Sequence, residues 1–169
     1  MSPIPRRQLL LGGTALGVLG LGVAANSILG PAAEDEAFEV MHSDAEWRRL
    51  LAPAQYVVLR KHKTEWAGSS PLDREKRAGT FRCAGCDLPL FSSATKFDSG
   101  TGWPSFWQPL DGAVATRTEW FLFLPQTEVH CRRCGGHLGH VFEDGPRPTG
   151  LRYCMNGVAL TFKPAATQS

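Results

Sequence analysis

Residues 81–87 read FRCAGCD, and residues 130–136 read HCRRCGG. Each stretch carries two cysteines separated by two residues: Cys83 and Cys86 in the first, and Cys131 and Cys134 in the second. Two such pairs, separated by a long insert, supply the four thiolates of a tetrahedral zinc site. Since four thiolates fill the coordination of the metal, we expect this zinc to stabilise the fold and to perform no catalysis.

Two other interpretations of the cysteine pairs stay open. One is a thioredoxin-like redox pair, which needs a βαβ context that the flanking residues do not supply. The other is a set of structural disulfides, for which four cysteines allow three pairings. Disulfides do not require two equally spaced pairs, so the pattern favours zinc.

Cys154 is the fifth cysteine and stands apart from the pairs, in the stretch RYCMNG at residues 152–157. We expect a β-strand here, in which alternate side chains share a face, so Arg152, Cys154 and Asn156 point the same way. A cation two residues before the thiol favours the thiolate, and an amide two residues after it can position a polar ligand. Cys154 is therefore a candidate nucleophile, and the alternative is a buried, inert cysteine.

His137 and His140 lie three residues apart in the stretch HLGH. Histidine exchanges a proton near neutral pH, so an imidazole beside a thiolate can supply the proton for an oxygen leaving group. The pair is a candidate for catalysis if the fold brings it to Cys154, and otherwise each histidine is a structural residue. The remaining histidines have no partner pattern, and we interpret them as structural or exposed: His42, His62 and His130.

Residues 98–107 read DSGTGWPSFW and combine a tight turn with three large aromatic side chains. Trp103 lies between a glycine and a proline, which holds it as one wall of an apolar pocket for a small group such as a methyl. Phe106 and Trp107 either line the same pocket or belong to an ordinary aromatic core.

Two short helices are expected before the cysteine pairs. Residues 43–46 (SDAE) have capping-box spacing, so one helix begins there and ends before Pro53. A second helix covers residues 54–60. Three of its side chains are expected to point inward: Tyr56, Val57 and Leu59.

From Gly79 onward the sequence favours a mainly β fold, with mostly antiparallel sheets. Short segments rich in aromatic and β-branched residues are bounded there by Gly, Pro or Asp. These segments are residues 80–83, 120–124, 140–142, 151–156 and 158–163.

The N-terminus has the features of a targeting segment. Residues 5–11 read PRRQLLL, a twin-arginine export pattern, and an uncharged apolar run follows, with small residues at 23–25 for a cleavage site. The alternative is a retained anchor, because residues 9–29 are long enough to cross a bilayer. The chain then divides into a signal segment (1–33), a linker (34–42) and a folded domain (43–166).

Twin-arginine export carries folded proteins, so a thiolate metal site can be loaded before it meets an oxidising compartment. We therefore expect a periplasmic protein, or one anchored in the membrane and facing the periplasm.

Arg6 and Arg7 account for the formal net charge of +2. They are two of the 18 Lys and Arg residues, so 16 basic residues remain against 16 acidic ones. A neutral folded part argues against a nucleic-acid partner, which phosphate contacts would hold to basic residues. At 169 residues, the chain has room for one ordinary domain plus an extension.

These motifs together resemble the B-type methionine sulfoxide reductases, which reduce the R epimer of methionine sulfoxide. The resemblance covers roughly residues 43–164 and includes all five cysteines. The matching segments are Thr64-Glu65, residues 79–106, residues 130–142 and residues 150–162. The resemblance implies a tent-like arrangement of antiparallel sheets, stapled by zinc, with short helices at the N-terminal side.

The resemblance also implies roles for the site residues. Cys154 looks like the nucleophile, whose thiolate attacks the sulfoxide sulfur while a histidine protonates the oxygen. This attack releases methionine and leaves a sulfenic acid. The other implied positions are His137 and His140 lining the site, Asn156 helping to bind the oxygen, and Trp103 as the wall of the methyl pocket. From their places in the sequence, we add Phe106 and Arg152 as substrate-binding candidates.

Thr101 marks a departure from many members of this family, which carry a second, resolving cysteine at this position. If the four paired cysteines hold zinc, no thiol is left to form an internal disulfide with Cys154. We therefore predict a single-cysteine cycle in which an external, thioredoxin-like thiol reduces the sulfenic acid. We expect oxidised proteins or peptides as substrates, and a monomeric enzyme.

Two competing hypotheses belong to other classes of protein. A zinc-ribbon binding module without catalysis predicts a basic or apolar docking face and no effect of replacing Cys154. The neutral charge balance counts against it. A disulfide-exchange enzyme would use one Cys-x-x-Cys pair as its redox centre, and that pair could not also hold a metal permanently.

Overall fold

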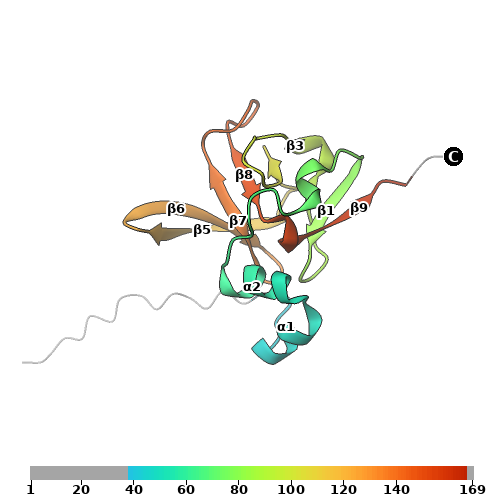
Figure 1. Ribbon diagram of the computed structural model, residues 1–169, viewed down its shortest axis with the longest axis vertical. Coiled ribbons are helices and arrows are strands. Elements are labelled where there is room, and N and C mark those ends of the chain that lie inside the picture. Colours follow the sequence, from blue (N-terminus) through green and yellow to red (C-terminus); the bar gives the residue numbers. More distant parts are fainter. Residues whose placement is uncertain (1–37, 167–169) are drawn as a thin grey trace, which may run out of the picture. The chain divides into compact units, whose positions relative to one another are not determined.

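The computed structural model describes residues 38–166, which fall within one compact unit spanning Glu36–Ser169. The expected signal segment, and with it the alternative of a retained membrane anchor, lies outside the described residues. Within residues 38–166, no helix combines the length and the apolar character that a membrane span requires. Figure 1 shows two short helices at one end of a body of β-strands.

The first helix, α1 (Asp44–Leu50), begins as its capping box predicts. The Ser43 hydroxyl accepts a hydrogen bond from the Glu46 backbone N–H at 3.3 Å, and the Glu46 carboxylate accepts one from the Ser43 N–H at 2.8 Å. These bonds satisfy amides that the start of a helix otherwise leaves unpaired. The helix ends before Pro53, which confirms the expected boundary.

The second helix, α2 (Pro53–Lys61), buries Tyr56, Val58 and Leu59. The expectation that Val57 points inward is wrong, because its side chain is 40% exposed. A helix turns by about 100° per residue, so Val57 lies on the face opposite the middle of the buried arc. Val58 takes the inward position instead.

Between residues 79 and 164, the described chain forms two antiparallel sheets, as expected. The smaller sheet has the order β2-β1-β9, and the larger has the order β3-β4-β8-β7-β6-β5. The smaller sheet consists of β1 (Gly79–Cys83), β2 (Pro89–Ser92) and β9 (Leu160–Pro164). The larger consists of β3 (Lys96–Phe97), β4 (Ser105–Phe106), β5 (Val114–Phe121), β6 (Leu124–Cys131), β7 (His137–Phe142) and β8 (Arg152–Met155). Short 3-10 helices are η1 (Pro71–Arg74), η2 (Ser93–Thr95) and η3 (Gly157–Ala159).

An aromatic core joins the two sheets. Phe106 in β4 packs against Phe81 in β1 and Phe91 in β2, with ring centroids 4.9 Å and 4.3 Å away. All three rings are fully buried, and each contributes about 1.5–3 kcal/mol of hydrophobic stabilisation. Because β4 also pairs with β8, this core holds the smaller sheet close to the strand that carries Cys154.

The expected strand at residues 120–124 is wrong, because a hairpin turn interrupts it. Phe121 of β5 pairs with Leu124 of β6, and between them Leu122 and Phe123 have φ angles of 45° and 70°. Leu and Phe seldom adopt this left-handed conformation, so the sequence carries no turn signal. Figure 1 shows the β5–β6 hairpin projecting from the rest of the strands. The other expected strands are present with slightly different ends.

The end of the expected linker belongs to the folded domain. The Val40 N–H donates a hydrogen bond to the Arg133 carbonyl at 2.9 Å. The Phe38 ring lies edge-on to the His130 ring, with centroids 5.9 Å apart. Residues 38–40 therefore pack beside the second cysteine pair, and the domain begins before residue 43.

Candidate active site

The four paired cysteines meet at the ends of strands from both sheets. Cys83 ends β1 and Cys131 ends β6. The Cys83 and Cys134 sulfurs are 3.7 Å apart, and those of Cys86 and Cys131 are 3.5 Å apart. A disulfide requires about 2.05 Å, whereas sulfurs bound tetrahedrally at about 2.3 Å from one ion lie about 3.8 Å from one another. The cluster can therefore hold a metal ion, and its cysteines are free rather than paired in disulfides.

The same proximity prevents the four thiols from ionising together without a cation. Hydrogen bonds from Cys134 and Cys83 lower the pKa of Cys131. The bond to Cys131 in turn raises the pKa of Cys134 and of Cys83. A bound cation supplies the charge that allows every sulfur to become a thiolate. The Arg60 guanidinium of α2 donates a hydrogen bond to the Cys134 carbonyl at 2.9 Å, which ties α2 to this cluster.

Cys154 lies in β8, in the interior of the larger sheet, and is half-buried. Its cross-strand partners are Ser105 in β4 and His140 in β7. Directly opposed residues of antiparallel strands share a face, so the sheet brings an imidazole beside the thiol. The His137 ring lies 5.4 Å from the His140 ring, between centroids. Gly139 permits this close pairing, since a Cβ there would collide with the Cys154 carbonyl oxygen.

A fully buried carboxylate, Glu128 in β6, gathers charged groups beside these histidines. It accepts a hydrogen bond from His137 Nδ1 at 2.7 Å, and Arg117 Nε lies 2.6 Å from its second oxygen. Burial alone would raise the pKa of Glu128, but hydrogen bonds from His130 and His137, together with the charge of Arg117, hold that pKa well below its usual range. Glu128 is therefore a carboxylate at neutral pH.

This carboxylate fixes the tautomer of His137. A carboxylate only accepts hydrogen bonds, so His137 Nδ1 carries the hydrogen and Nε2 is the nitrogen that can gain or lose a proton. His137 Nε2 is buried and makes no hydrogen bond to any of the described residues. The arrangement therefore presents one imidazole nitrogen of fixed orientation for proton transfer.

His62 joins this cluster from the end of α2, although no sequence pattern pointed to it. Its ring centroid lies 5.0 Å from that of His137, and its Nδ1 lies 3.4 Å from the Glu128 carboxylate. Burial lowers the pKa of His62, and burial followed by the charge of His137 lowers that of His140. His62, Glu128 and His137 place ligand atoms within 4.8 Å of one another, but Arg117 already neutralises the carboxylate, which argues against a metal ion there.

Asn156 and Trp103 are both tied to the backbone of Glu65. Asn156 Oδ1 accepts a hydrogen bond from the Glu65 N–H at 2.9 Å, and its Nδ2 donates to the Leu138 carbonyl at 3.1 Å. Trp103 Nε1 donates to the Glu65 carbonyl at 3.2 Å. The strand ends at Met155, so Asn156 does not continue its face, and both ends of its amide are engaged within the protein. In the sequence, Glu65 stands out only as part of a matching segment, and no pattern points to this positioning role.

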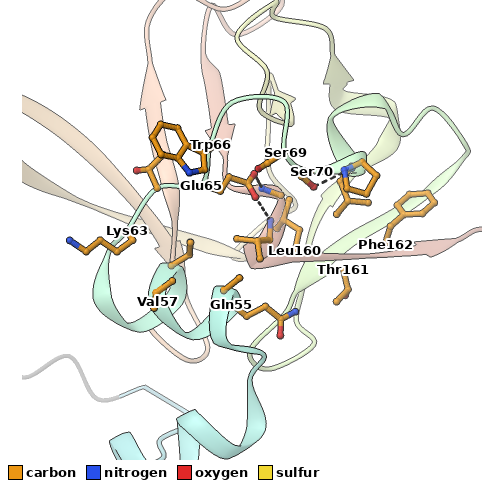
Figure 2. Close-up of a pocket in the computed structure, with 17 residues that line it drawn as sticks. Gln55, Val57, Lys63, Glu65, Trp66, Ser69, Ser70, Leu160, Thr161 and Phe162 are labelled. Atoms are coloured by element: carbon orange, nitrogen blue, oxygen red, sulfur yellow. Dashed lines mark hydrogen bonds between the residues drawn. The ribbon is translucent and has the colours of Figure 1, made fainter.

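The Glu65 carboxylate holds the segment that follows Asn156. It accepts hydrogen bonds from the Gly157 N–H at 2.5 Å and the Val158 N–H at 3.0 Å, and burial raises its pKa. Figure 2 shows Glu65 with these bonds beside a groove of about 650 Å³ that α2, the segment after it, η3 and β9 line. Cys154, His137 and His140 do not line this groove. Glu65 therefore lines the groove, and the candidate catalytic residues lie outside that lining.

Comparison with known proteins identifies the relatives of this chain. Residues 51–164 match the family model described as the SelR domain. The chain is 51% identical over 127 residues to "Peptide methionine sulfoxide reductase MsrB" of Agrobacterium fabrum, across 75% of this chain and 94% of that protein. The chain belongs to the MsrB family.

Two further relatives extend this relationship. The MsrB of Pseudomonas putida is 55% identical over 120 residues, across 70% of this chain and 90% of that protein. "Peptide methionine sulfoxide reductase B1, chloroplastic" of Arabidopsis thaliana is 50% identical over 119 residues, across 70% of this chain and 59% of that protein.

Within this MsrB domain, the side chains of Arg152 and Phe106, both expected to bind substrate, are already engaged by other residues of the protein. Arg152 is paired with the Asp144 carboxylate at 2.7 Å, and its guanidinium stacks over Phe142. Asp144 raises the pKa of Arg152, and the neighbouring Cys154 side chain raises it further, so the expected proximity of this cation to the thiol is present. A cavity of about 410 Å³ nevertheless includes Arg152 and Thr101 in its lining. Phe106 is fully buried in the aromatic core, where no substrate reaches it, so its expected place in the pocket is corrected.

Thr101 occupies the place beside the expected nucleophile where many MsrB sequences carry a cysteine. Its Oγ1 lies 3.8 Å from the Cys154 sulfur. A thiol at this position would be within reach of a sulfenic acid on Cys154, and the hydroxyl cannot form a disulfide. Each remaining cysteine belongs to the four-sulfur cluster.

Proposed function

We propose that this protein reduces methionine-R-sulfoxide, in oxidised peptides and proteins, to methionine. Membership of the MsrB family supports the reaction, and the R epimer follows from the resemblance to B-type reductases. The observation that carries the proposal is the placement of Cys154, the cysteine outside the four-cysteine cluster, directly opposite His140, whose ring lies beside that of His137. A zinc-ribbon binding module has no need of this arrangement.

The first chemical step transfers the sulfoxide oxygen to Cys154. The thiolate attacks the sulfoxide sulfur, and His137 in its imidazolium form delivers its Nε2 proton to the oxygen. The resulting hydroxyl passes to Cys154 as a sulfenic acid while methionine leaves. The sulfoxide is reduced by two electrons and Cys154 is oxidised by two. Glu128 orients His137 through Nδ1, so that Nε2 is the atom that gives the proton. Trp103, held by Glu65, forms the wall against the substrate methyl group.

The second step needs a thiol from outside the protein. An external thiolate attacks the sulfenic acid sulfur, which releases water and forms a mixed disulfide. A second external thiol then attacks this disulfide and restores Cys154. Thr101 in the place of a resolving cysteine supports this single-cysteine cycle, with a thioredoxin-like protein as the class of reductant.

We also propose that the four-cysteine cluster holds one structural zinc ion. The donor set supports zinc, because four thiolates complete the coordination of this ion. The measured sulfur–sulfur distances of 3.7 Å and 3.5 Å are close to those of a tetrahedral site. A zinc ion there would cross-link the ends of β1 and β6 and would take no part in catalysis.

The twin-arginine pattern supports export of the folded, metal-loaded protein to the periplasm, with residues 1–33 either removed or retained as an anchor. The membrane then contacts the protein only through that segment. In this compartment, repair of methionine oxidised during oxidative stress is the corresponding role.

The test is an assay of separated R and S sulfoxide epimers of a blocked methionine, with dithiothreitol as reductant. We expect turnover of the R epimer, and a loss of at least about 10³-fold in Cys154→Ser because the nucleophile is removed. Mass spectrometry of the oxidised protein should show a mixed disulfide at Cys154. Turnover of the S epimer alone, activity that survives Cys154→Ser, or an internal disulfide to Cys154 would overturn the proposal.

A further inference from the structure

Three hydroxyl groups form a chain that ends at the Cys154 sulfur. Thr101 Oγ1 is 3.8 Å from that sulfur and 2.8 Å from Ser99 Oγ. Ser99 Oγ is 2.7 Å from Ser105 Oγ, and Ser105 donates onward to the Trp103 carbonyl at 3.0 Å. Ser105 is fully buried and is also the cross-strand partner of Cys154, so the chain is built into the sheet.

The direction of this chain is fixed when Cys154 is a thiol. Each hydroxyl has one hydrogen to donate. Ser105 gives its hydrogen to the Trp103 carbonyl, so it can only accept from Ser99. Ser99 in turn accepts from Thr101, and Thr101 accepts from the Cys154 S–H. In this direction every hydrogen has an acceptor.

A thiolate reverses the chain. The thiolate can only accept. It receives a hydrogen bond from Arg152 and attracts the Thr101 hydrogen as well, so Thr101 can no longer donate to Ser99. Ser99 then donates to Thr101, Ser105 donates to Ser99, and the Trp103 carbonyl loses its donor. If Ser105 keeps its bond to Trp103 instead, two neighbouring hydroxyl oxygens face each other with no hydrogen between them. Either way, ionisation of the sulfur costs one hydrogen bond, at the far end of the chain or between two of its hydroxyls.

We propose that Thr101, Ser99 and Ser105 form a reversible hydrogen-bond chain that sets how readily Cys154 presents a thiolate. Thr101 acts on the sulfur directly, while Ser99 and Ser105 are positioning residues that compete for the Thr101 hydrogen. The inference rests on the proposed function only in taking Cys154 as the nucleophile. It gives the hydroxyl at position 101 a role of its own, beyond the absence of a resolving thiol.

The chain makes predictions of opposite sign for its two ends. Thr101→Val keeps the shape and removes the donor to the thiolate, so alkylation of Cys154 by iodoacetamide at pH 7 should slow about fivefold, the net effect of one hydrogen bond. Thr101→Ser restores a hydroxyl and should restore the rate. A purely steric role for Thr101 would leave Thr101→Val close to wild type.

Ser99→Ala and Ser105→Ala should have the reverse effect. Each removes the competition for the Thr101 hydrogen, or the bond that reversal breaks, so alkylation should become about fivefold faster. Ser99 is half-exposed and Ser105 is buried, so Ser99→Ala reports on the chain even if Ser105→Ala disturbs the strand. The matched control is Thr95→Val, whose hydroxyl bonds the Ser92 and Gln108 carbonyls away from the sulfur, and which should keep the wild-type rate.

The rates are measured on the full-length, zinc-loaded protein by mass spectrometry of the Cys154 peptide. Slower alkylation in Thr101→Val with faster alkylation in Ser99→Ala supports the chain. Slower or unchanged alkylation in Ser99→Ala, or an unchanged rate in Thr101→Val, overturns it. Alkylation needs no sulfoxide, so this result is independent of whether the R epimer is turned over.

Discussion

His62 lies beside Glu128 and His137, and these surroundings change the pKa of its imidazole. It ends α2 with φ 53° and ψ 34°, and this left-handed backbone turns its ring toward Glu128 and His137. Partial burial is the largest influence on His62 and lowers its pKa, although 39% of the side chain stays exposed, and the Glu128 charge opposes that effect. The folded protein therefore prefers the neutral ring.

This preference predicts a loss of stability in mild acid. A histidine whose pKa is lower in the folded than in the unfolded chain contributes stability above its ordinary value of about 6.5, and this stability is lost as pH falls through the folded pKa. The wild-type urea midpoint should therefore fall between pH 7.5 and pH 5.5. In His62→Asn, which accepts the left-handed backbone, the fall should be smaller. An equal fall in both proteins would show that His62 does not contribute to the acid sensitivity.

The residues that sequence analysis identified and those that it missed differ in the range of their contacts. The capping box at Ser43 is local, so spacing alone predicts it. Cys154 and His140 were identified from their chemistry, but their pairing depends on the register of β7 and β8. Glu128 was missed because Arg117 and His137 on the neighbouring strands, and His62 at the end of α2, meet it only through the register of the sheet and the packing of the helix. Its only sequence signal is an acidic residue within a strand that ends buried.

At the scale of elements, the β5–β6 hairpin combines an unfavourable turn with exposed apolar side chains. Leu122 and Phe123 both have positive φ, as two-residue hairpin turns of type I′ require, although Asn and Gly are the usual residues there. Their side chains are 75% and 93% exposed, so they gain little from burial. The hairpin therefore holds strain that its own side chains do not repay.

A better turn sequence should stabilise this hairpin. Leu122→Asn combined with Phe123→Gly removes two unfavourable left-handed residues, and we expect the free energy of unfolding to rise by about 1 kcal/mol. Chemical denaturation measures this change, and Phe123→Ala, which keeps the left-handed conformation in a residue with a Cβ, is the control and should show no gain. A decrease in the double variant would mean that these side chains stabilise the fold through contacts.

The same hairpin shows why element boundaries were harder to predict than fold class. Antiparallel sheet was expected correctly from short, β-rich segments bounded by turn residues. The segment at 120–124 satisfied the same rule, yet it contains a turn, because propensity cannot reveal a hairpin that lacks the usual turn residues. The position of the turn follows only from the pairing of β5 with β6, which runs from Phe121 and Leu124 to Val114 and Cys131.

At the scale of the whole molecule, the cysteine cluster and the aromatic core are two separate links between the sheets. Phe106 joins β4 to the smaller sheet, and the cluster joins the ends of β1 and β6. The spacing of the cysteines predicted the cluster, because a metal site imposes the same local geometry on each pair. The sequence did not decide whether Phe106 belongs to the core or to the substrate pocket, since an aromatic residue in a turn-rich segment suits both.

The proposed zinc site predicts how many cysteines react rapidly with a thiol reagent. In the zinc-loaded protein, only the Cys154 thiol should react rapidly, because metal binding occupies the other sulfurs, and all five should react after chelation and unfolding.

Cys86→Ser should lower the melting temperature by about 10 °C or more, because metal binding contributes to folding free energy. Cys154→Ser is the matched control: it should remove the fast-reacting thiol and leave the melting temperature and the zinc content unchanged. More than one fast thiol in the zinc-loaded protein, or a stable Cys86→Ser, would mean that the aromatic core alone holds the sheets together.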